Sequence, residues 1–134
     1  MSSLRNKIAD YFRERPEVIA VYLFGSYARG KAHRFSDVDV GVLMAGRNSD
    51  FHIEKKKEYM TGLARRTRKD VDLVILNSLS EVFLRQIFLE GECILVNDPK
   101  KLSHHKMVMF AKIAEFGYYR PQMESGFITN IMEA

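Results

Sequence analysis

The chain has 134 residues, 46% of them hydrophobic and 28% charged, a balance typical of one soluble globular domain. Its 21 lysines and arginines against 17 acidic residues leave a net charge of only +4, which permits an anionic partner without indicating one. A single cysteine excludes an internal disulfide, and no apolar run approaches the roughly 18 residues that a membrane span needs. Because no apolar signal segment follows Met1 either, we expect a cytoplasmic protein without membrane contact.

Apolar spacing divides the chain into alternating helices and strands. Residues 3–15 have the spacing of an amphipathic helix, which Ser2 or Ser3 can cap and Pro16 ends. A continuous apolar run over residues 18–24 predicts a buried strand. The remaining expected elements are a short helix at 26–29, strands at 37–44, 71–76 and 92–97, and helices at 51–68, between residue 78 and Gly91, and at 99–116.

Two local patterns predict how helices start and where one strand lies. The expected N-caps are Ser49 or Asp50 before the helix at 51–68, the capping box from Ser78 to Glu81, and Asp98 ahead of Pro99. The strand at 71–76 is apolar on both faces apart from Asp72. Because strands that are buried on both faces lie inside a sheet, this pattern predicts a central strand.

Acidic side chains stand at the start of a predicted strand. Asp37 and Asp39 alternate with valines at the start of the run 37–44, so the strand period places both carboxylates on one face. Two carboxylates between apolar neighbours are costly unless positive charge lies against them. A hard divalent cation such as Mg²⁺, which prefers oxygen ligands and is usually shared with substrate phosphates, would supply it. The alternative is a simple turn or N-cap ahead of the strand.

The turn before this strand has residues suited to a phosphate. Gly25 follows the strand at 18–24 directly, and a glycine there lets the backbone turn sharply and approach a ligand closely. A helix that starts at Ser26 would direct free N–H groups and the positive end of its dipole toward an anion, although Ser26 can also act simply as a cap. Arg29 can reach either a phosphate or a surface carboxylate.

Taken together, these residues resemble a known family. The glycine–serine pair, an interval of ten residues, and then Asp37 and Asp39 are similar to the signature of the nucleotidyltransferase superfamily that includes DNA polymerase β. That family has a third carboxylate on a later strand, and Asp72 stands at the expected place, with Asp70 as the alternative. Among short members, the chain most resembles the minimal nucleotidyltransferase antitoxins, the MntA-like group.

The resemblance implies an α/β (α+β) fold in which helices flank a mixed β-sheet. It covers the order of strands and helices over nearly all of the chain, so we expect a single nucleotidyltransferase domain over residues 1–134. Its core would span residues 16–97, and a helical C-terminal region would follow over residues 98–134.

The resemblance also implies a magnesium-dependent enzyme with ATP as its substrate. Asp37 and Asp39 would bridge two Mg²⁺ ions, with Mn²⁺ as an alternative. Asp72 would complete the metal site and accept the proton of the acceptor hydroxyl. The nucleotide-binding residues expected from the motif are Gly25, Ser26 and Arg29.

The hydroxyl group that accepts AMP is expected to come from another molecule. The catalytic unit would fill almost the whole chain, which leaves no domain to hold a template or a tRNA. The antitoxin resemblance implies a HEPN ribonuclease toxin as the partner, disabled by AMP on a tyrosine. The alternatives are a small-molecule nucleotidyltransferase subunit and an antitoxin that acts by binding alone. Direct nucleic-acid binding is not expected, because aromatic residues do not interleave with the lysines of the helix at 51–68.

The last residues carry many apolar side chains for a terminus. Within residues 122–134 these are Met123, Phe127, Ile128, Ile131 and Met132. Because large exposed apolar patches usually mark interaction sites, we expect this segment to dock on its own domain or on a partner. Its deletion should weaken association and leave Mg²⁺-ATP binding intact.

Overall fold

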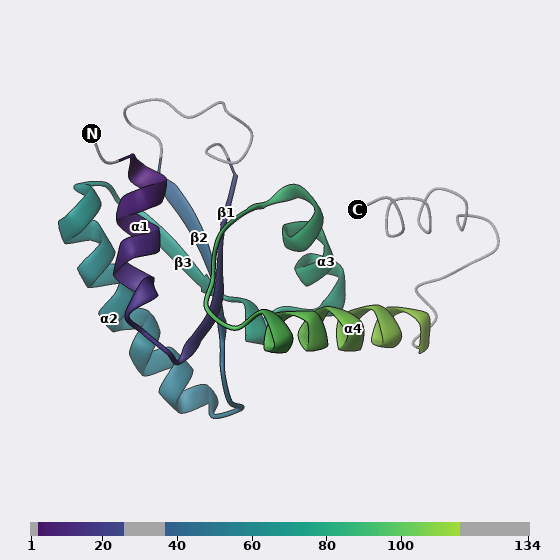
Figure 1. Cartoon of the computed structure of the whole chain (residues 1–134). Coiled ribbons are helices and arrows are strands. Elements are labelled where there is room, and N and C mark those ends of the chain that lie inside the picture. Colours follow the sequence, from purple (N-terminus) through teal and green to yellow (C-terminus); the bar gives the residue numbers. More distant parts are fainter. Residues whose placement is uncertain (1–2, 26–36, 116–134) are drawn as a thin grey trace.

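The computed structural model describes residues 3–25 and 37–115 of the chain (Figure 1). In this part, β1 (Val18–Phe24), β2 (Val38–Met44), β3 (Val71–Ile75) and β4 (Glu92–Val96) form a single sheet in the order β3-β2-β1-β4. Strands β2 and β3 run parallel, whereas β1 is antiparallel to both β2 and β4. A mixed sheet flanked by helices confirms the predicted fold class.

Helices cover both faces of this sheet (Figure 1). They are α1 (Leu4–Arg13), α2 (Ser49–Thr67), α3 (Glu81–Glu90) and α4 (Pro99–Glu115), with the 3-10 helix η1 (Leu76–Ser78) directly after β3. α1 and α2 pack on one face, and α3 and α4 pack on the other. No helix in the described part of the chain is long and apolar enough to cross a bilayer. The predicted helix at 26–29 and the tail at 122–134 lie outside the described residues.

Two hydrophobic clusters hold these layers together, one on each face of the sheet. Beneath α1 and α2, the ring of Phe12 packs edge-on against Tyr59, with the ring centroids 5.0 Å apart. Beneath α3 and α4, Leu102 joins Leu43 and Leu76 in the second cluster. Both faces of β1 are therefore buried, as its continuous apolar run predicts.

The prediction that the third strand is central is wrong, because β3 lies at an edge of the sheet in the part of the chain that the structure describes. Alternate residues of β3 are buried on the α2 side, and Asp72 between them is exposed. Leu76, expected in the strand, belongs to η1 and packs over Gly41 of β2, where an added Cβ would lie 2.8 Å from its Cδ2. The second apolar face thus reflects the packing of the segment that follows β3, and within residues 3–25 and 37–115 no further strand pairs there.

Sequence signals at two helix starts are confirmed. At the start of α1, the N–H of Asn6 donates a hydrogen bond of 3.1 Å to Oγ of Ser3. At the start of α4, the N–H of Lys101 donates one of 3.1 Å to Oδ1 of Asp98. In each case the side chain accepts a hydrogen bond from a backbone N–H that has no partner within its helix. The sequence can predict such a cap because the two residues are close neighbours in the chain.

The N-caps predicted for α2 and α3 are wrong. The residues expected to cap α2 are already inside the helix, and its cap is Asn48, whose Oδ1 accepts a hydrogen bond of 3.1 Å from the N–H of Phe51. The capping box fails because Ser78 belongs to η1, where its hydroxyl donates to the carbonyl of Ile75 at 2.8 Å. α3 begins after Ser80, whose side chain makes no capping hydrogen bond.

Candidate functional site

Predicted carboxylates lie side by side where β2 and β3 begin. The parallel register pairs Asp39 of β2 with Asp72 of β3, and Asp37 lies one residue before β2. Asp39 is half-buried, whereas Asp37 and Asp72 are exposed. The structure therefore brings these three residues, called the aspartate cluster below, to one end of the sheet.

The charges of the aspartate cluster act on one another. Burial raises the pKa of Asp39 above its ordinary value, and the negative charges of Asp72 and then Asp37 raise it further. The physical cause is that both burial and nearby like charge disfavour the ionised carboxylate. A cation bound among these groups would remove the repulsion, so the cluster is electrostatically suited to a divalent ion.

The donor chemistry of the aspartate cluster also fits a hard divalent cation. Carboxylate oxygens are the ligands that Mg²⁺ prefers in proteins. As the side chains stand, no group of three or more His, Cys, Asp or Glu residues within 3–25 and 37–115 converges closely enough to hold a metal ion. Asp37 and Asp72 are exposed, so core packing does not fix their side-chain rotamers. These three aspartates are the residues that would hold Mg²⁺.

Gly25 marks the point where the chain leaves β1 beside the aspartate cluster. Its φ of +70° lies in the left-handed region that favours glycine. A Cβ at this position would lie 2.2 Å from Oδ2 of Asp39, well inside van der Waals contact. The register agrees, since Phe24 pairs with Asp39 across β1 and β2. The backbone at Gly25 thus approaches the carboxylate of Asp39 itself, and a side chain at this position would force that carboxylate to move.

The remaining predicted site residues are placed differently. Ser26 and Arg29 lie outside the described residues. Asp70, the alternative to Asp72, precedes β3, and its carbonyl oxygen accepts a hydrogen bond of 3.0 Å from the N–H of Val38. Because Asp72 and not Asp70 occupies the position paired with β2's carboxylate, Asp72 is the candidate for the third acidic role.

A cavity of about 270 Å³, not predicted from the sequence, lies next to the aspartate cluster. It is lined by Phe24 and Gly25 at the end of β1, by Val74 of β3 and by residues of α3. Gly91 also lines it, and an added Cβ there would lie 3.1 Å from the carbonyl oxygen of Leu23. Glycine therefore lets the end of α3 approach β1. In the sequence, the same glycine indicates only the end of a helix.

The sequence matches the model of a known protein family. The family is described as polymerase beta, nucleotidyltransferase, and the match spans residues 6–100. This range includes the glycine–serine pair and all three members of the aspartate cluster.

One curated relative resembles a large part of the chain. It is the protein adenylyltransferase MntA of Shewanella oneidensis strain MR-1, which is 39% identical over 88 residues. These residues are 65% of this chain and 61% of the relative, so the match spans about three fifths of the relative's length.

Two solved structures have chains of similar fold. A chain in the crystal structure of a toxin–antitoxin with AMP-PNP has a TM-score of 0.66 and 28% identity, over 96% of this chain and 98% of that one. The second structure is a rebuilt and re-refined complex of tri-AMPylated Shewanella oneidensis HEPN toxin with MNT antitoxin. Its matching chain has a TM-score of 0.61 and 25% identity, over 96% of both chains.

Proposed function

The chain belongs to the polymerase β nucleotidyltransferase family, and from this premise we propose that it is an adenylyltransferase that moves AMP from ATP to a hydroxyl group of a protein. The observation that carries the proposal is the pairing of Asp39 with Asp72 at the start of two parallel strands, with Asp37 one residue before β2. The similarity to a protein adenylyltransferase and to a toxin–antitoxin with AMP-PNP supports ATP as the substrate.

The transfer would require Mg²⁺, with Mn²⁺ as an alternative ion. Asp37 and Asp39 would hold two ions, and Asp72 would complete the site, because mutual repulsion among these carboxylates favours a cation between them. Divalent cations at such a site neutralise phosphate oxygens and lower the pKa of an attacking hydroxyl. By the motif of the family, the triphosphate would be held by the backbone at Gly25 and by Ser26 and Arg29.

In this proposal Asp72 would accept the proton of the acceptor hydroxyl. In the transfer, the hydroxyl oxygen bonds to the α-phosphorus while the bond from that phosphorus to the bridging oxygen of the pyrophosphate group breaks. The proton passes to Asp72, and pyrophosphate leaves. Asp72 is exposed on the strand that forms the edge of the described sheet, so a hydroxyl group on another molecule can reach it from solvent. This position suits an acceptor that another protein delivers.

The acceptor in this proposal is a tyrosine of a HEPN-family toxin, and its modification would neutralise the toxin. The similarity to MntA and to a chain from a complex of tri-AMPylated HEPN toxin with MNT antitoxin supports this partner. The protein would then act as an antitoxin in a hetero-oligomer, in the cytoplasm where ATP is available.

We further infer one nucleotidyltransferase domain over residues 1–134. The support is that helices from both halves of the chain pack on the same sheet. Residues 16–97 would form its core and residues 98–134 its helical C-terminal region. The apolar tail at 122–134 is the segment we expect to contact a partner.

Intact mass of a co-expressed HEPN partner tests the proposal. With the wild-type chain, the partner should gain the mass of one or more AMP groups and lose its ribonuclease activity. With Asp39→Asn, the added mass should disappear because the site loses a proposed metal ligand. Asp70→Asn is the matched control, since Asp70 is an exposed carboxylate two residues before Asp72 and outside the paired position.

Two outcomes would contradict the proposal. If the wild-type chain adds no mass to the partner, the protein is not an AMP transferase for that partner. If Asp39→Asn neutralises the toxin as well as the wild type does, the antitoxin acts by binding alone.

A further inference from the structure

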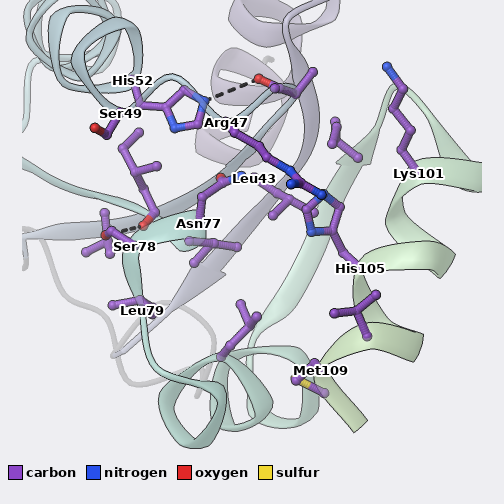
Figure 2. A pocket seen from close by; sticks show the side chains of 18 of the residues that line it. Leu43, Arg47, Ser49, His52, Asn77, Ser78, Leu79, Lys101, His105 and Met109 are labelled. Carbon is purple, nitrogen blue, oxygen red and sulfur yellow. Dashed lines mark hydrogen bonds between the residues drawn. The ribbon is translucent and has the colours of Figure 1, made fainter. Parts of the chain in front are cut away.

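A larger cavity lies at the opposite end of the same two strands (Figure 2). Its volume is about 880 Å³, and it is lined by the end of β2, the loop after it, the first turns of α2, η1 and one side of α4. Asp39 stands near the first residue of β2, whereas Leu43 near the last residue lines the cavity. Along β2 Asp39 and Leu43 are four residues apart, whereas on β3 the lining begins at Val74, two residues after Asp72.

The wall of this cavity is rich in basic side chains, and we call it the basic cavity. The basic residues that line it are Arg47, His52, Lys56, Lys101, His104, His105 and Lys112. Among the described residues, Glu81 is the carboxylate in the lining. Its charge is already engaged, because its Oε1 lies 3.8 Å from Nζ of Lys112. Lys101 is also paired, since its Nζ lies 4.0 Å from Oδ2 of Asp98, so the charges most available to an anion are those of Arg47 and Lys56.

Two of these cations have no acidic partner in the part of the chain that the structure describes. Arg47 and Lys56 lie more than 4.0 Å from any described carboxylate. Figure 2 shows Arg47 extending across the cavity toward His105 of α4. Positive groups that converge on one hollow from α2, α4 and the loop between β2 and α2 favour a ligand with several negative charges.

The floor of the basic cavity is apolar and held in place. Leu43 lines it as a fully buried side chain, so the apolar surface open to a ligand comes from partly exposed residues such as Ile53, which is 55% exposed, and Val108, which is 37% exposed. Asn77 fixes the end of β2, because its Nδ2 donates to the carbonyl of Met44 at 2.9 Å and its Oδ1 accepts from the N–H of Met44 at 2.8 Å. An apolar floor beneath a cationic rim suits a ligand with a flat apolar part and attached phosphates.

We propose that the basic cavity binds a nucleoside polyphosphate at a non-catalytic site, separate from the aspartate cluster. Arg47, Lys56 and Lys101 would hold the phosphates at the rim, and the base would lie over the apolar floor. A nucleic-acid strand fits less well, because the described lining has no Phe, Tyr or Trp on which successive bases could stack. This inference goes beyond AMP transfer and does not depend on it.

Calorimetric titration of the full chain in EDTA tests this site, because nucleotide binding at the aspartate cluster is expected to need a divalent ion. ATP should bind under these conditions. Adenosine keeps only the floor contacts and inorganic tripolyphosphate keeps only the rim contacts, so each should bind at least about tenfold more weakly than ATP. Asp39→Asn should bind ATP in EDTA as tightly as the wild type.

Two pairs of neighbouring lysines give matched variants. Lys56 and Lys101 line the basic cavity, whereas Lys57 and Lys100 are exposed outside it. Lys56→Gln and Lys101→Gln should each weaken ATP binding by about tenfold, and Lys57→Gln and Lys100→Gln by less than about twofold. On the wild-type protein, ATP in EDTA should also slow acetylation of Lys56 and Lys101 but not of the other two lysines. This labelling test needs no variant to fold.

Four results would overturn the inference. One is the absence of ATP binding in EDTA at millimolar ATP. Equal weakening by Lys56→Gln and Lys57→Gln would indicate general attraction to surface charge. If tripolyphosphate binds as tightly as ATP, the cavity does not recognise the nucleoside part of the ligand. Displacement of ATP by an equal concentration of poly-glutamate would identify a surface for an acidic protein instead.

Discussion

The two ends of the β2–β3 pair carry opposite chemistry. Asp39 and Asp72 stand where the strands begin, and Arg47 and Lys56 gather beyond the point where β2 ends. The strand from Asp39 to Met44 spans ~17 Å at ~3.3 Å per residue. This is about twice the Debye length of ~8 Å at physiological salt, so each end is largely screened from the other. One short sheet can thus present a cation site and an anion site without either cancelling the other.

The two ends also differ in how they are held. The aspartate cluster lies at an exposed edge, and its carboxylates repel one another. The basic cavity has an apolar floor, and Asn77 ties its wall to the end of β2. In the proposed function the cluster would gain its geometry from a bound ion, whereas the cavity is already formed. Substitutions at the two ends should give separable effects.

Asp72→Asn is expected to give the largest difference between the effects at the two ends, on AMP transfer and on ATP binding in EDTA. Removing a proton acceptor at the reacting group should lower the rate of AMP transfer by roughly 10²–10⁴-fold. ATP binding in EDTA should not change, because Asp72 does not line the basic cavity and its basic residues come from α2, α4 and the loop after β2. Single-turnover transfer to the partner measures the first effect, and calorimetry measures the second. An Asp72→Asn protein with near wild-type transfer would move the third acidic role to another residue such as Asp70.

Gly25→Ala should destabilise the fold beside the aspartate cluster. Its backbone has φ +70°, and the new Cβ would meet Oδ2 of Asp39 at 2.2 Å. Gly46→Ala is the matched control, since Gly46 has φ +79° and no atom within 4 Å of an added Cβ. Backbone strain alone should cost about 1–2 kcal/mol of unfolding free energy in either variant. Chemical denaturation should show a further loss of unfolding free energy for Gly25→Ala. Equal losses in the two variants would mean that the contact with Asp39 does not affect stability.

Asp39→Asn should raise the melting temperature of the metal-free protein at neutral pH. Burial and the charges of Asp72 and Asp37 raise the pKa of Asp39, so its ionised form is disfavoured in the fold. A neutral isostere removes this repulsion, with a gain on the order of a few degrees. Mg²⁺ with ATP should reverse the ranking, since it stabilises only a complete metal site. If Mg²⁺-ATP stabilises both proteins equally, the metal assignment is wrong.

The smallest effect is expected at the basic end, from His105. Burial lowers the pKa of His105 below its ordinary value of 6.5, and the neighbouring His104 lowers it further. The unfolded chain then binds protons more readily than the folded protein, so stability falls as pH falls below about 6.5. His105→Gln should reduce this loss between pH 7.5 and 5.5 by about one or two degrees of melting temperature. A steeper loss in His105→Gln than in the wild type would reverse the sign of the argument.

The acidic end could be predicted in large part from the sequence, because its signals are local. The alternation of Asp37 and Asp39 with valines requires only the strand period, whereas Asp72 was expected from the resemblance to a family that has a third carboxylate on a later strand. The caps at Ser3 and Asp98 likewise involve residues three positions apart. The alternation and the caps rest on chain geometry over a few residues, which a sequence displays directly.

Two of the wrong predictions share one physical cause. The third strand was expected to be central because Leu76 was counted with it, but Leu76 packs from η1 onto Gly41 of a different strand. The capping box at Ser78 failed for the same reason, since the chain turns there and the serine hydroxyl bonds to the carbonyl of Ile75. The polarity of a residue indicates whether it prefers apolar or polar surroundings. It does not indicate which helix or strand provides them.

Local patterns in the sequence predict the order of strands and helices, the aspartates at the strand starts and the glycine that precedes them. The contact of Gly25 with Asp39, the edge position of β3 in the described sheet and the basic cavity arise only when the elements pack together. Lys56 and Lys101 are far apart in the chain and follow no shared period, so no local pattern could bring them together. Their meeting depends on how α2 and α4 pack around the end of β2, a property of the whole fold.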